Sequence, residues 1–303
     1  MPAPLLVDGF SVLAPGYDAV LCDVWGVVHN GVAALAPAGD ALTRFRHAGG
    51  TVLLVSNAPR PGAAVIRMLD RFGVPHSAYD DIITSGDLTR EFIVAHPDRT
   101  VFHVGPERDR SIFAGLELRF GSVEAADYVI CTGLFDDERE TPESYRVLLE
   151  RMRGRRLLFF CANPDLVVER GDRLIYCAGA VADLYAQLGG EVLYAGKPHR
   201  PIYDAALARI AAARGAPLAT ARVLAIGDSI RTDLAGAAAL GIDGVFITRG
   251  IHAEELGHRD DPDLDRLGRF FAAITLSVLD SAVTMMNGTP ARLGSPRISL
   301  SRS

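Results

Sequence analysis

Seven short apolar runs place the strongest constraint on how this chain folds. Their sequences are AVLCDVW, TVLLVS, TVFHVG, DYVICTG, RLLFFCAN, RVLAIGD and DGVFITRG. A strand with one face in water alternates apolar and polar residues, whereas most of these runs are continuously apolar, as in strands buried on both faces. We therefore expect internal strands of sheets that are covered on both sides.

Helical patterns lie between these runs. The clearest span residues 37–48, 60–72 and 201–214, and each is followed by a glycine of the kind that ends helices. A further pattern covers residues 142–152. Alternation of strands and helices predicts an α/β fold with mostly parallel sheets. The length of 303 residues is enough for two domains.

Composition excludes several classes of protein. Hydrophobic residues make up 49% and charged residues 22%, which is typical of a folded globular chain. The net charge of −6 gives no general attraction to nucleic acid or to an anionic membrane. The sequence shows neither a leader pattern nor a run of about 18 apolar residues. We expect a cytoplasmic protein that binds neither nucleic acid nor membrane.

The four cysteines form no CxxC pair. They are Cys22, Cys131, Cys161 and Cys177, and they lie mostly within apolar runs. This pattern predicts buried free thiols in a reducing compartment rather than a metal site or a disulfide framework.

Polar residues follow several of the apolar stretches. Ligands of open parallel sheets bind outside the carboxyl ends of the strands, so residues at strand exits are the first candidates for chemistry. The residues concerned are Asp23, Ser56, Asn57, Lys197, Asp228 and Asp233. We expect them to converge on one crevice.

Each of these residues also has a plainer interpretation. Ser56, Asn57 and Asp228 are residue types that commonly form turns or cap helices, and a lone lysine such as Lys197 is usually a solvated surface amine. Asp23 is harder to explain in this way, because it lies in a segment that otherwise looks buried and its carboxylate needs a partner there.

Together these groups suit phosphoryl transfer. Asp23 and Asp228 can hold Mg²⁺, which prefers oxygen ligands, and Asp233 can orient its waters. With the phosphate charge neutralised, Asp23 is the candidate nucleophile for an aspartyl-phosphate intermediate. Ser56 and Lys197, with the backbone amides that begin at Asn57, would hold the remaining phosphoryl oxygens.

The order and spacing of the groups resemble the four motifs of the haloacid dehalogenase-like superfamily. GDSIRTDLAGAAALGI resembles the signature of its class IIA members, and CANPDLVVER and GAVADLYAQLGGEVLYAGKP resemble their NPD and glycine-lysine-proline segments. The resemblance covers most of residues 18–258. Known members are phosphatases of nucleotides, 4-nitrophenyl phosphate, phosphoglycolate and pyridoxal phosphate, which implies a small phosphorylated metabolite as substrate.

The resemblance also implies a domain organisation. A Rossmann-like core would comprise residues 1–83 and 196–285, with an inserted α/β cap domain at 84–195. Asn163 and Asp165 of the cap would contact substrate, although an Asn-Pro-Asp turn explains them equally well. Residues 286–303 are rich in Gly, Pro, Ser and Arg, which predicts a disordered tail. An alanine-rich helix surface near residues 205–213 would suit a homodimer as well as internal packing.

One departure from the family pattern concerns proton transfer. The first motif usually carries a second aspartate, a general acid and base, where this chain has Trp25. Losing such a group typically costs about 10²–10⁴ in rate. The family's metal contact here is a backbone carbonyl, which Trp25 retains. His29 is a candidate replacement acid or base, and we expect the Trp25 side chain to fill space rather than to stack on a substrate.

Three functions are compatible with this departure. The first is a phosphatase that obtains its proton elsewhere or uses a leaving group that hardly needs one. The second is a hydrolase that cleaves a carbon–phosphorus or carbon–halogen bond. The third is a phosphate-ligand binding or regulatory protein without turnover. We favour an enzyme, because a binding protein has no need of a carboxylate such as Asp23 facing phosphorus.

Overall fold

The computed structural model describes residues 5–7, 9–170, 173–257, 263, 265–269 and 298–301. The chain divides into two compact units. One unit comprises Met1–Val55, Leu69–Asp81 and Ala206–Ser303, and the other comprises Ser56–Met68 and Ile82–Ala205.

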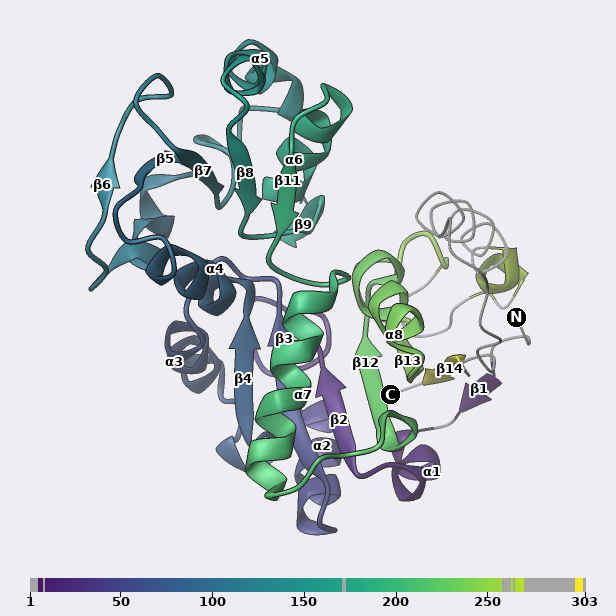
Figure 1. Cartoon of the computed structure of the whole chain (residues 1–303). Coiled ribbons are helices and arrows are strands. Elements are labelled where there is room, and N and C mark those ends of the chain that lie inside the picture. Colours follow the sequence, from purple (N-terminus) through teal and green to yellow (C-terminus); the bar gives the residue numbers. More distant parts are fainter. Residues whose placement is uncertain are drawn as a thin grey trace, which may run out of the picture. The chain divides into compact units, whose positions relative to one another are not determined.

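The larger sheet has seven strands (Figure 1). Their order is β1-β14-β13-β12-β2-β3-β4, and every pair from β1 to β3 is parallel. In that order the strands span Leu5–Val7, Ile298–Ser301, Asp243–Ile247, Val223–Gly227, Ala19–Cys22, Thr51–Ser56 and Asp81–Thr84. Every residue of the central strands β12, β2 and β3 is buried, which confirms the prediction drawn from the continuous apolar runs.

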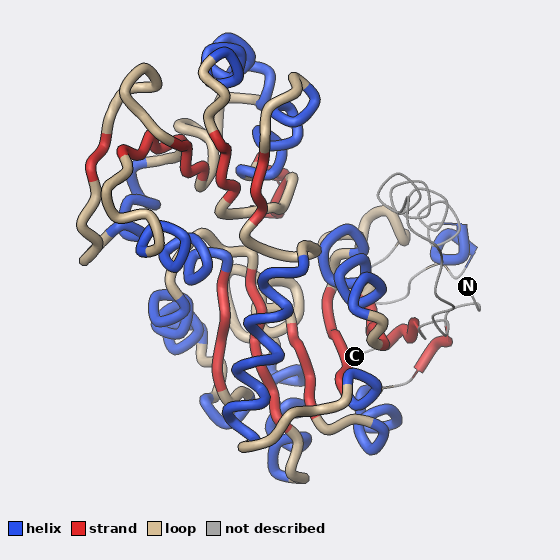
Figure 2. The backbone as a smooth tube through the Cα atoms, in the orientation of Figure 1, coloured by secondary structure: helices blue, strands red, loops and turns tan. Residues whose placement is uncertain are grey.

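Helices connect these strands. Their bounds are Phe10–Leu13 (α1), Ala36–His47 (α2), Gly62–Phe72 (α3), Arg200–Arg214 (α7) and Ala235–Leu240 (α8). Each of the three clearest predicted helices begins and ends within two residues of its expected bounds. In the view of Figure 2, α7 crosses in front of the strands and α2 lies behind them, so both faces of the sheet carry helices.

The second unit contains a five-stranded parallel sheet of order β11-β8-β7-β5-β6. In that order the strands span Val192–Tyr194, Leu158–Cys161, Tyr128–Cys131, Thr100–Val104 and Arg119–Phe120. An antiparallel hairpin joins β9 (Val167–Arg170) to β10 (Arg173–Tyr176). The helices are α4 (Ser85–Val94), α5 (Arg146–Gly154) and α6 (Ala178–Gln187). Parallel sheets with intervening helices confirm the predicted α/β class.

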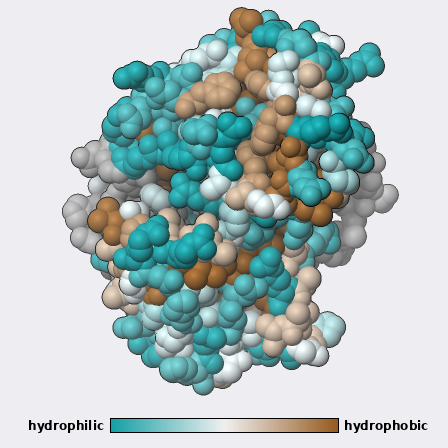
Figure 3. Space-filling model, turned by 90° about the vertical axis from the view of Figure 1, so that its left-hand side faces the viewer, coloured by the Kyte–Doolittle hydropathy of each residue, from teal (hydrophilic) through white to brown (hydrophobic). Residues whose placement is uncertain are grey.

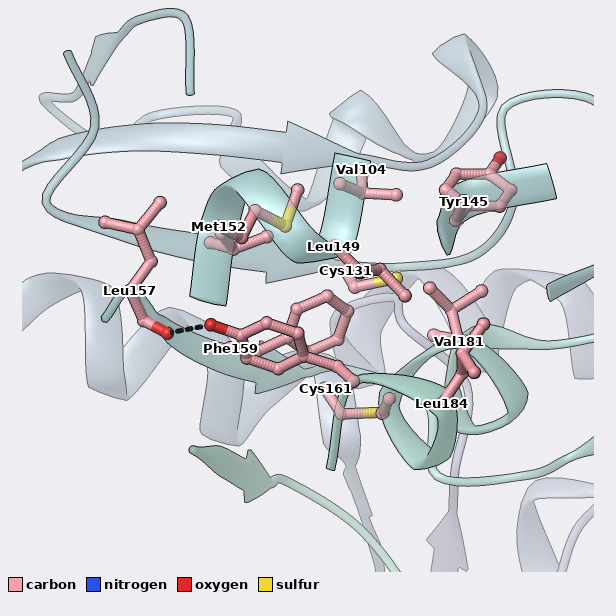
Figure 4. Packing of buried hydrophobic residues seen from close by; sticks show 14 of the residues in the cluster. Val104, Cys131, Tyr145, Leu149, Met152, Leu157, Phe159, Cys161, Val181 and Leu184 are labelled. Carbon is pink, nitrogen blue, oxygen red and sulfur yellow. Dashed lines mark hydrogen bonds between the residues drawn. The ribbon is translucent and has the colours of Figure 1, made fainter. Parts of the chain in front are cut away.

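Apolar side chains from the five-stranded sheet and from helices α5 and α6 form a core of this unit (Figure 4). Cys131 and Phe159 come from neighbouring strands, and Leu149 of α5 and Val181 of α6 meet them with none of their surface exposed. Burying an aliphatic or aromatic side chain of this size contributes about 1.5–3 kcal/mol. This core holds the ends of β8 and β11, from which two candidate site segments emerge.

The four cysteines are free and buried, as predicted. Burial raises the pKa of the Cys131 thiol to about 12, so at neutral pH it is protonated and packs as a small apolar side chain.

The predicted disordered tail, residues 286–303, falls mostly outside the described residues. Its residues 298–301 form β14, which pairs with β1 on one side and β13 on the other. Their sequence, ISLS, alternates apolar and polar residues with the period of a strand. Four residues were too short a pattern to outweigh the composition around them.

The surface in view in Figure 3 is mostly hydrophilic, with hydrophobic residues in several groups among the polar ones. Among the helices of the described residues, none combines the length and the hydropathy that crossing a membrane requires.

Candidate active site

Three buried carboxylates meet at the carboxyl ends of two neighbouring strands. Asp23 directly follows β2, Asp228 directly follows β12, and Asp233 lies in the single π-helical turn Ile230–Leu234 after β12. Their exposed fractions are 9%, 5% and 4%. One oxygen from each lies within 4.8 Å of the others. We call these three residues the acidic cluster.

The strand register and local hydrogen bonds hold the acidic cluster in place. Strands β2 and β12 pair in parallel, and the backbone N–H of Asp23 donates to the Ile226 carbonyl at 2.8 Å. Asp228 Oδ2 accepts from the Ile251 N–H at 2.9 Å, and Asp233 Oδ2 accepts from the Ser229 N–H at 3.2 Å. The N-cap position of the following turn is Ser229 rather than Asp228.

The donor set of the acidic cluster fits a hard divalent cation. Three carboxylates at this separation repel each other in a buried site, and a bound cation removes that repulsion. Mg²⁺ takes oxygen ligands and is usually held by one or two carboxylates with waters and substrate phosphate completing its shell. Asp23 and Asp228 supply such ligands directly, and Asp233 stands close enough to hold a metal-bound water.

Trp25 lies beside the acidic cluster with 38% of its surface exposed. The next residue is Gly26, with φ at +80°, where a β-carbon would lie 1.9 Å from Asp228 Oδ2. Only glycine fits there, because Asp228 occupies the space of a side chain. The indole carries one N–H donor and no group that can accept a proton at physiological pH.

His29 is enclosed rather than poised over the site. None of its surface is exposed, and its Nδ1 accepts from the Gly31 N–H at 2.9 Å, which leaves the proton of the neutral ring on Nε2. Burial lowers the pKa of His29 to about 4, so the ring is neutral at pH 7. Its ring packs against those of Trp25 and Phe72. These properties do not support the expected acid or base role, and we assign His29 a packing role instead.

A second group of candidate residues lies within the other unit and centres on Asn57. The Asn57 Nδ2 donates to Asp165 Oδ1 at 2.8 Å and to the Lys197 carbonyl at 3.0 Å. The Lys197 backbone N–H donates back to Asn57 Oδ1 at 2.7 Å. Both ends of the Asn57 carboxamide are thus occupied by protein. We call these three residues the Asn57 clamp, and it fixes the main chain at Lys197.

Lys197 and Ser56 are both buried, at 3% and 7% exposure. The interpretation of Lys197 as a solvated surface amine is therefore wrong. Ser56 is the last residue of β3, and its Oγ accepts from the Ala58 N–H at 3.2 Å, as in a turn that starts at the strand end.

Asn163 and Asp165 form the turn that was the alternative to substrate contact. The Asn163 Oδ1 accepts from the Asp165 N–H at 3.1 Å, while the Asp165 carboxylate belongs to the Asn57 clamp. Sequence reasoning identified all three clamp residues but not their bonding. Asn57 and Asp165 stand 108 positions apart, and no local pattern signals such a pair. Gly26 and Gly31 were missed as well, although they flank His29 in the segment GVVHNG.

The chain matches known family models and solved structures. The family model described as haloacid dehalogenase-like hydrolase matches residues 20–119, and a second, HAD-hydrolase-like model matches residues 194–267. A solved hydrolase of the haloacid dehalogenase-like family from Brucella suis 1330 is 50% identical, with a TM-score of 0.78 over 86% of this chain and 96% of that one. No curated protein matches the chain.

More distant structures share the fold. A possible sugar phosphatase from Cytophaga hutchinsonii is 17% identical, with a TM-score of 0.71 over 97% of each chain. A p-nitrophenyl phosphatase from Archaeoglobus fulgidus is 23% identical, with a TM-score of 0.63 over 82% of this chain and 95% of that one. At these identities the likeness extends to the arrangement of strands and helices.

Proposed function

Because the chain belongs to the haloacid dehalogenase-like hydrolase family, we propose that it is a Mg²⁺-dependent phosphatase of small phosphorylated metabolites. The observation that carries this proposal is the acidic cluster, since it joins a buried candidate nucleophile, Asp23, to two further carboxylates in reach of one cation. Phosphatases among the structural neighbours, including one that acts on glycerol phosphate, support the same class of reaction.

In the proposed reaction the Asp23 carboxylate attacks phosphorus. The bond from phosphorus to the leaving oxygen breaks, its electron pair stays on that oxygen, and the phosphoryl group becomes an aspartyl phosphate. Water then attacks phosphorus, both of its protons leave with the released phosphate, and the Asp23 carboxylate is regenerated. Bound Mg²⁺ would neutralise phosphate charge and so permit two anions to approach.

The remaining residues act on the substrate phosphate or on the metal. Asp23, Asp228 and the backbone carbonyl of Trp25 would hold Mg²⁺, and Asp233 would orient a metal-bound water. The Ser56 hydroxyl and the Lys197 ammonium contact phosphoryl oxygens, and an ammonium held in a buried site stabilises developing charge better than one in water. Asn57 contributes by fixing Lys197. A cytoplasmic location and a homodimer stay predictions.

Phosphate release from a panel of phosphoesters tests this function. The native protein is assayed with Mg²⁺ and with EDTA, beside Asp23→Asn and the matched control Asp40→Asn, which alters an exposed aspartate. We expect release that needs Mg²⁺, falls at least 100-fold in Asp23→Asn and persists in Asp40→Asn. Equal release by Asp23→Asn and the native protein would contradict the mechanism.

Silence across the panel would contradict phosphatase function itself. If Mg²⁺ still bound, the result would favour a phosphate-ligand binding protein or a hydrolase of carbon–phosphorus or carbon–halogen bonds.

A further inference from the structure

The indole of Trp25 lies on a bed made by residues that follow it closely in the chain. Its ring meets the His29 ring edge-on, with centroids 5.0 Å apart and planes at 71°. Gly31, with φ at +87°, approaches so closely that a β-carbon there would lie 2.7 Å from indole Cζ2. His29 in turn packs against Phe72. The indole is therefore held in place while 38% of the residue stays exposed.

Trp25 lies in the same chain segment as the first carboxylate of the acidic cluster. Asp23 precedes Trp25 by two residues. Gly26 follows Trp25 directly, and a β-carbon on Gly26 would lie 1.9 Å from Asp228 Oδ2. A substrate with its phosphorus at Asp23 has its leaving group on the side of phosphorus opposite the attacking oxygen. Trp25 is the exposed apolar side chain that the first motif offers to such a group.

The chemistry of Trp25 also limits which leaving groups can depart from the substrate. Without a general acid in the first motif, the leaving oxygen departs as an anion. An alkyl alkoxide is a poor anion, so its ester loses most of the roughly 10²–10⁴ rate factor that a general acid supplies. A phenol-type oxygen has a pKa of about 10, as in tyrosine, and departs without a proton far more readily.

We propose that Trp25 selects phosphate monoesters of planar, phenol-type hydroxyl groups, an inference that rests on the proposed phosphatase function. The aromatic ring of the substrate stacks on the exposed indole. In the first step the aryl phosphate dianion and the Asp23 carboxylate give a phenolate and the aspartyl phosphate. In the second step water and the aspartyl phosphate give dihydrogen phosphate and the Asp23 carboxylate.

Three substrates of similar size separate stacking from leaving-group acidity. Phenyl phosphate has a ring and an acidic leaving group, benzyl phosphate has a ring and an alkoxide leaving group, and cyclohexyl phosphate has neither. We expect kcat/KM for phenyl phosphate to exceed that for cyclohexyl phosphate at least 100-fold. Benzyl phosphate should compete with phenyl phosphate for binding and turn over slowly.

Variants of Trp25 assign the preference to this side chain. Trp25→Phe should keep the binding of phenyl phosphate within about 3-fold, whereas Trp25→Ala should raise the KM of phenyl phosphate about 3- to 10-fold more than it raises that of cyclohexyl phosphate. Gly31→Ala, which displaces the indole without altering it, should resemble Trp25→Ala. Thermal melting of each variant reports that it folds.

Trp25 is the one tryptophan of the sequence, so its fluorescence reports ligand stacking directly. The Asp23→Asn variant with Mg²⁺ is titrated with each ester. We expect phenyl and benzyl phosphate to change the emission saturably and cyclohexyl phosphate to leave it unchanged.

Two results would overturn the inference and leave the phosphatase function intact. One is hydrolysis of cyclohexyl and phenyl phosphate with kcat/KM values within 10-fold of each other. The other is an emission change that is the same for all three esters. Failure of the proposed function differs from both, because no ester would then be hydrolysed by the native protein.

Discussion

At the scale of single residues, the first motif carries the proposed nucleophile, Asp23, and has Trp25 where a proton-donating aspartate would stand. Asp23 and Trp25 stand two positions apart, so one substitution can supply the missing group without altering the strand that positions the carboxylate. The indole rests on His29 and Gly31 with 38% of the residue exposed, which makes this position open to exchange.

Trp25→Asp should raise the hydrolysis of alkyl phosphates by about 10²-fold or more, because a carboxyl group here can protonate the leaving alkoxide. The measurement is kcat for cyclohexyl phosphate at saturating Mg²⁺. Trp25→Asn is the matched control, since it removes the indole equally and carries no acid. A Trp25→Asp protein that folds, binds Mg²⁺ and gains nothing over Trp25→Asn would contradict this account.

A second residue-scale prediction concerns His103 in the second unit. Burial, together with the nearby charge of Arg110 and against the opposing effect of Glu107, lowers the pKa of His103 to about 4. The side chain takes up a proton near pH 6.5 in the unfolded chain but only near pH 4 in the folded chain. The contribution of neutral, buried His103 to the free energy of unfolding is therefore complete above about pH 6.5 and decreases as the pH drops towards 4.

Between pH 7 and pH 5, the native protein should lose about 1–2 kcal/mol more of its free energy of unfolding than His103→Gln does. Urea unfolding of the native and variant proteins at pH 7 and pH 5 measures it. An equal loss of unfolding free energy in both proteins would show that folding does not lower the pKa of His103.

At the scale of elements, the sequence predicted the strands better than it predicted the contacts of the residues that follow them. Continuous apolar runs identify β2, β3 and β12 because strands buried on both faces carry no polar alternation. The same patterns predict that Asp23 and Asp228 lie close together, because parallel strands have their carboxyl ends at one edge of the sheet. The Asn57 clamp depends instead on tertiary contacts between distant segments, which leave no periodic trace.

Asn57→Ala should lower the free energy of unfolding by about 2–4 kcal/mol, because it removes two bonds to main-chain groups at Lys197 and one to a carboxylate. Chemical denaturation measures the change. Asn30→Ala is the matched control, since Asn30 bonds to two backbone N–H groups at an exposed turn and should cost about 0.5 kcal/mol or less. Equal losses for the two variants would show that the clamp adds no stability.

At the scale of the whole molecule, metal binding and stability are linked through the acidic cluster. The proposed Mg²⁺ site requires the folded chain, where three carboxylates converge, and at 100 times its Kd such a ligand would stabilise by about 2.7 kcal/mol. We expect Mg²⁺ to raise the melting temperature and EDTA to reverse the rise.

Asp228→Asn should abolish this rise, and it should also melt at a higher temperature than the native protein when both are metal-free, because one of three repelling charges is gone. Asp40→Asn serves as the control with a full Mg²⁺ response. A native protein whose melting temperature ignores Mg²⁺ would argue against a metal at this cluster.

The strand order of the larger sheet also sets the order in which the protein can be built on the ribosome. Strand β2 pairs with β12, which begins about 200 residues later, and synthesis at about 5–20 residues per second separates the two by about 10–40 seconds. The five strands of the second unit's parallel sheet, β5 to β8 and β11, emerge within that interval and can assemble first. The acidic cluster forms only afterwards, so a nascent chain carries its nucleophile for most of its synthesis without the partners that would make it reactive.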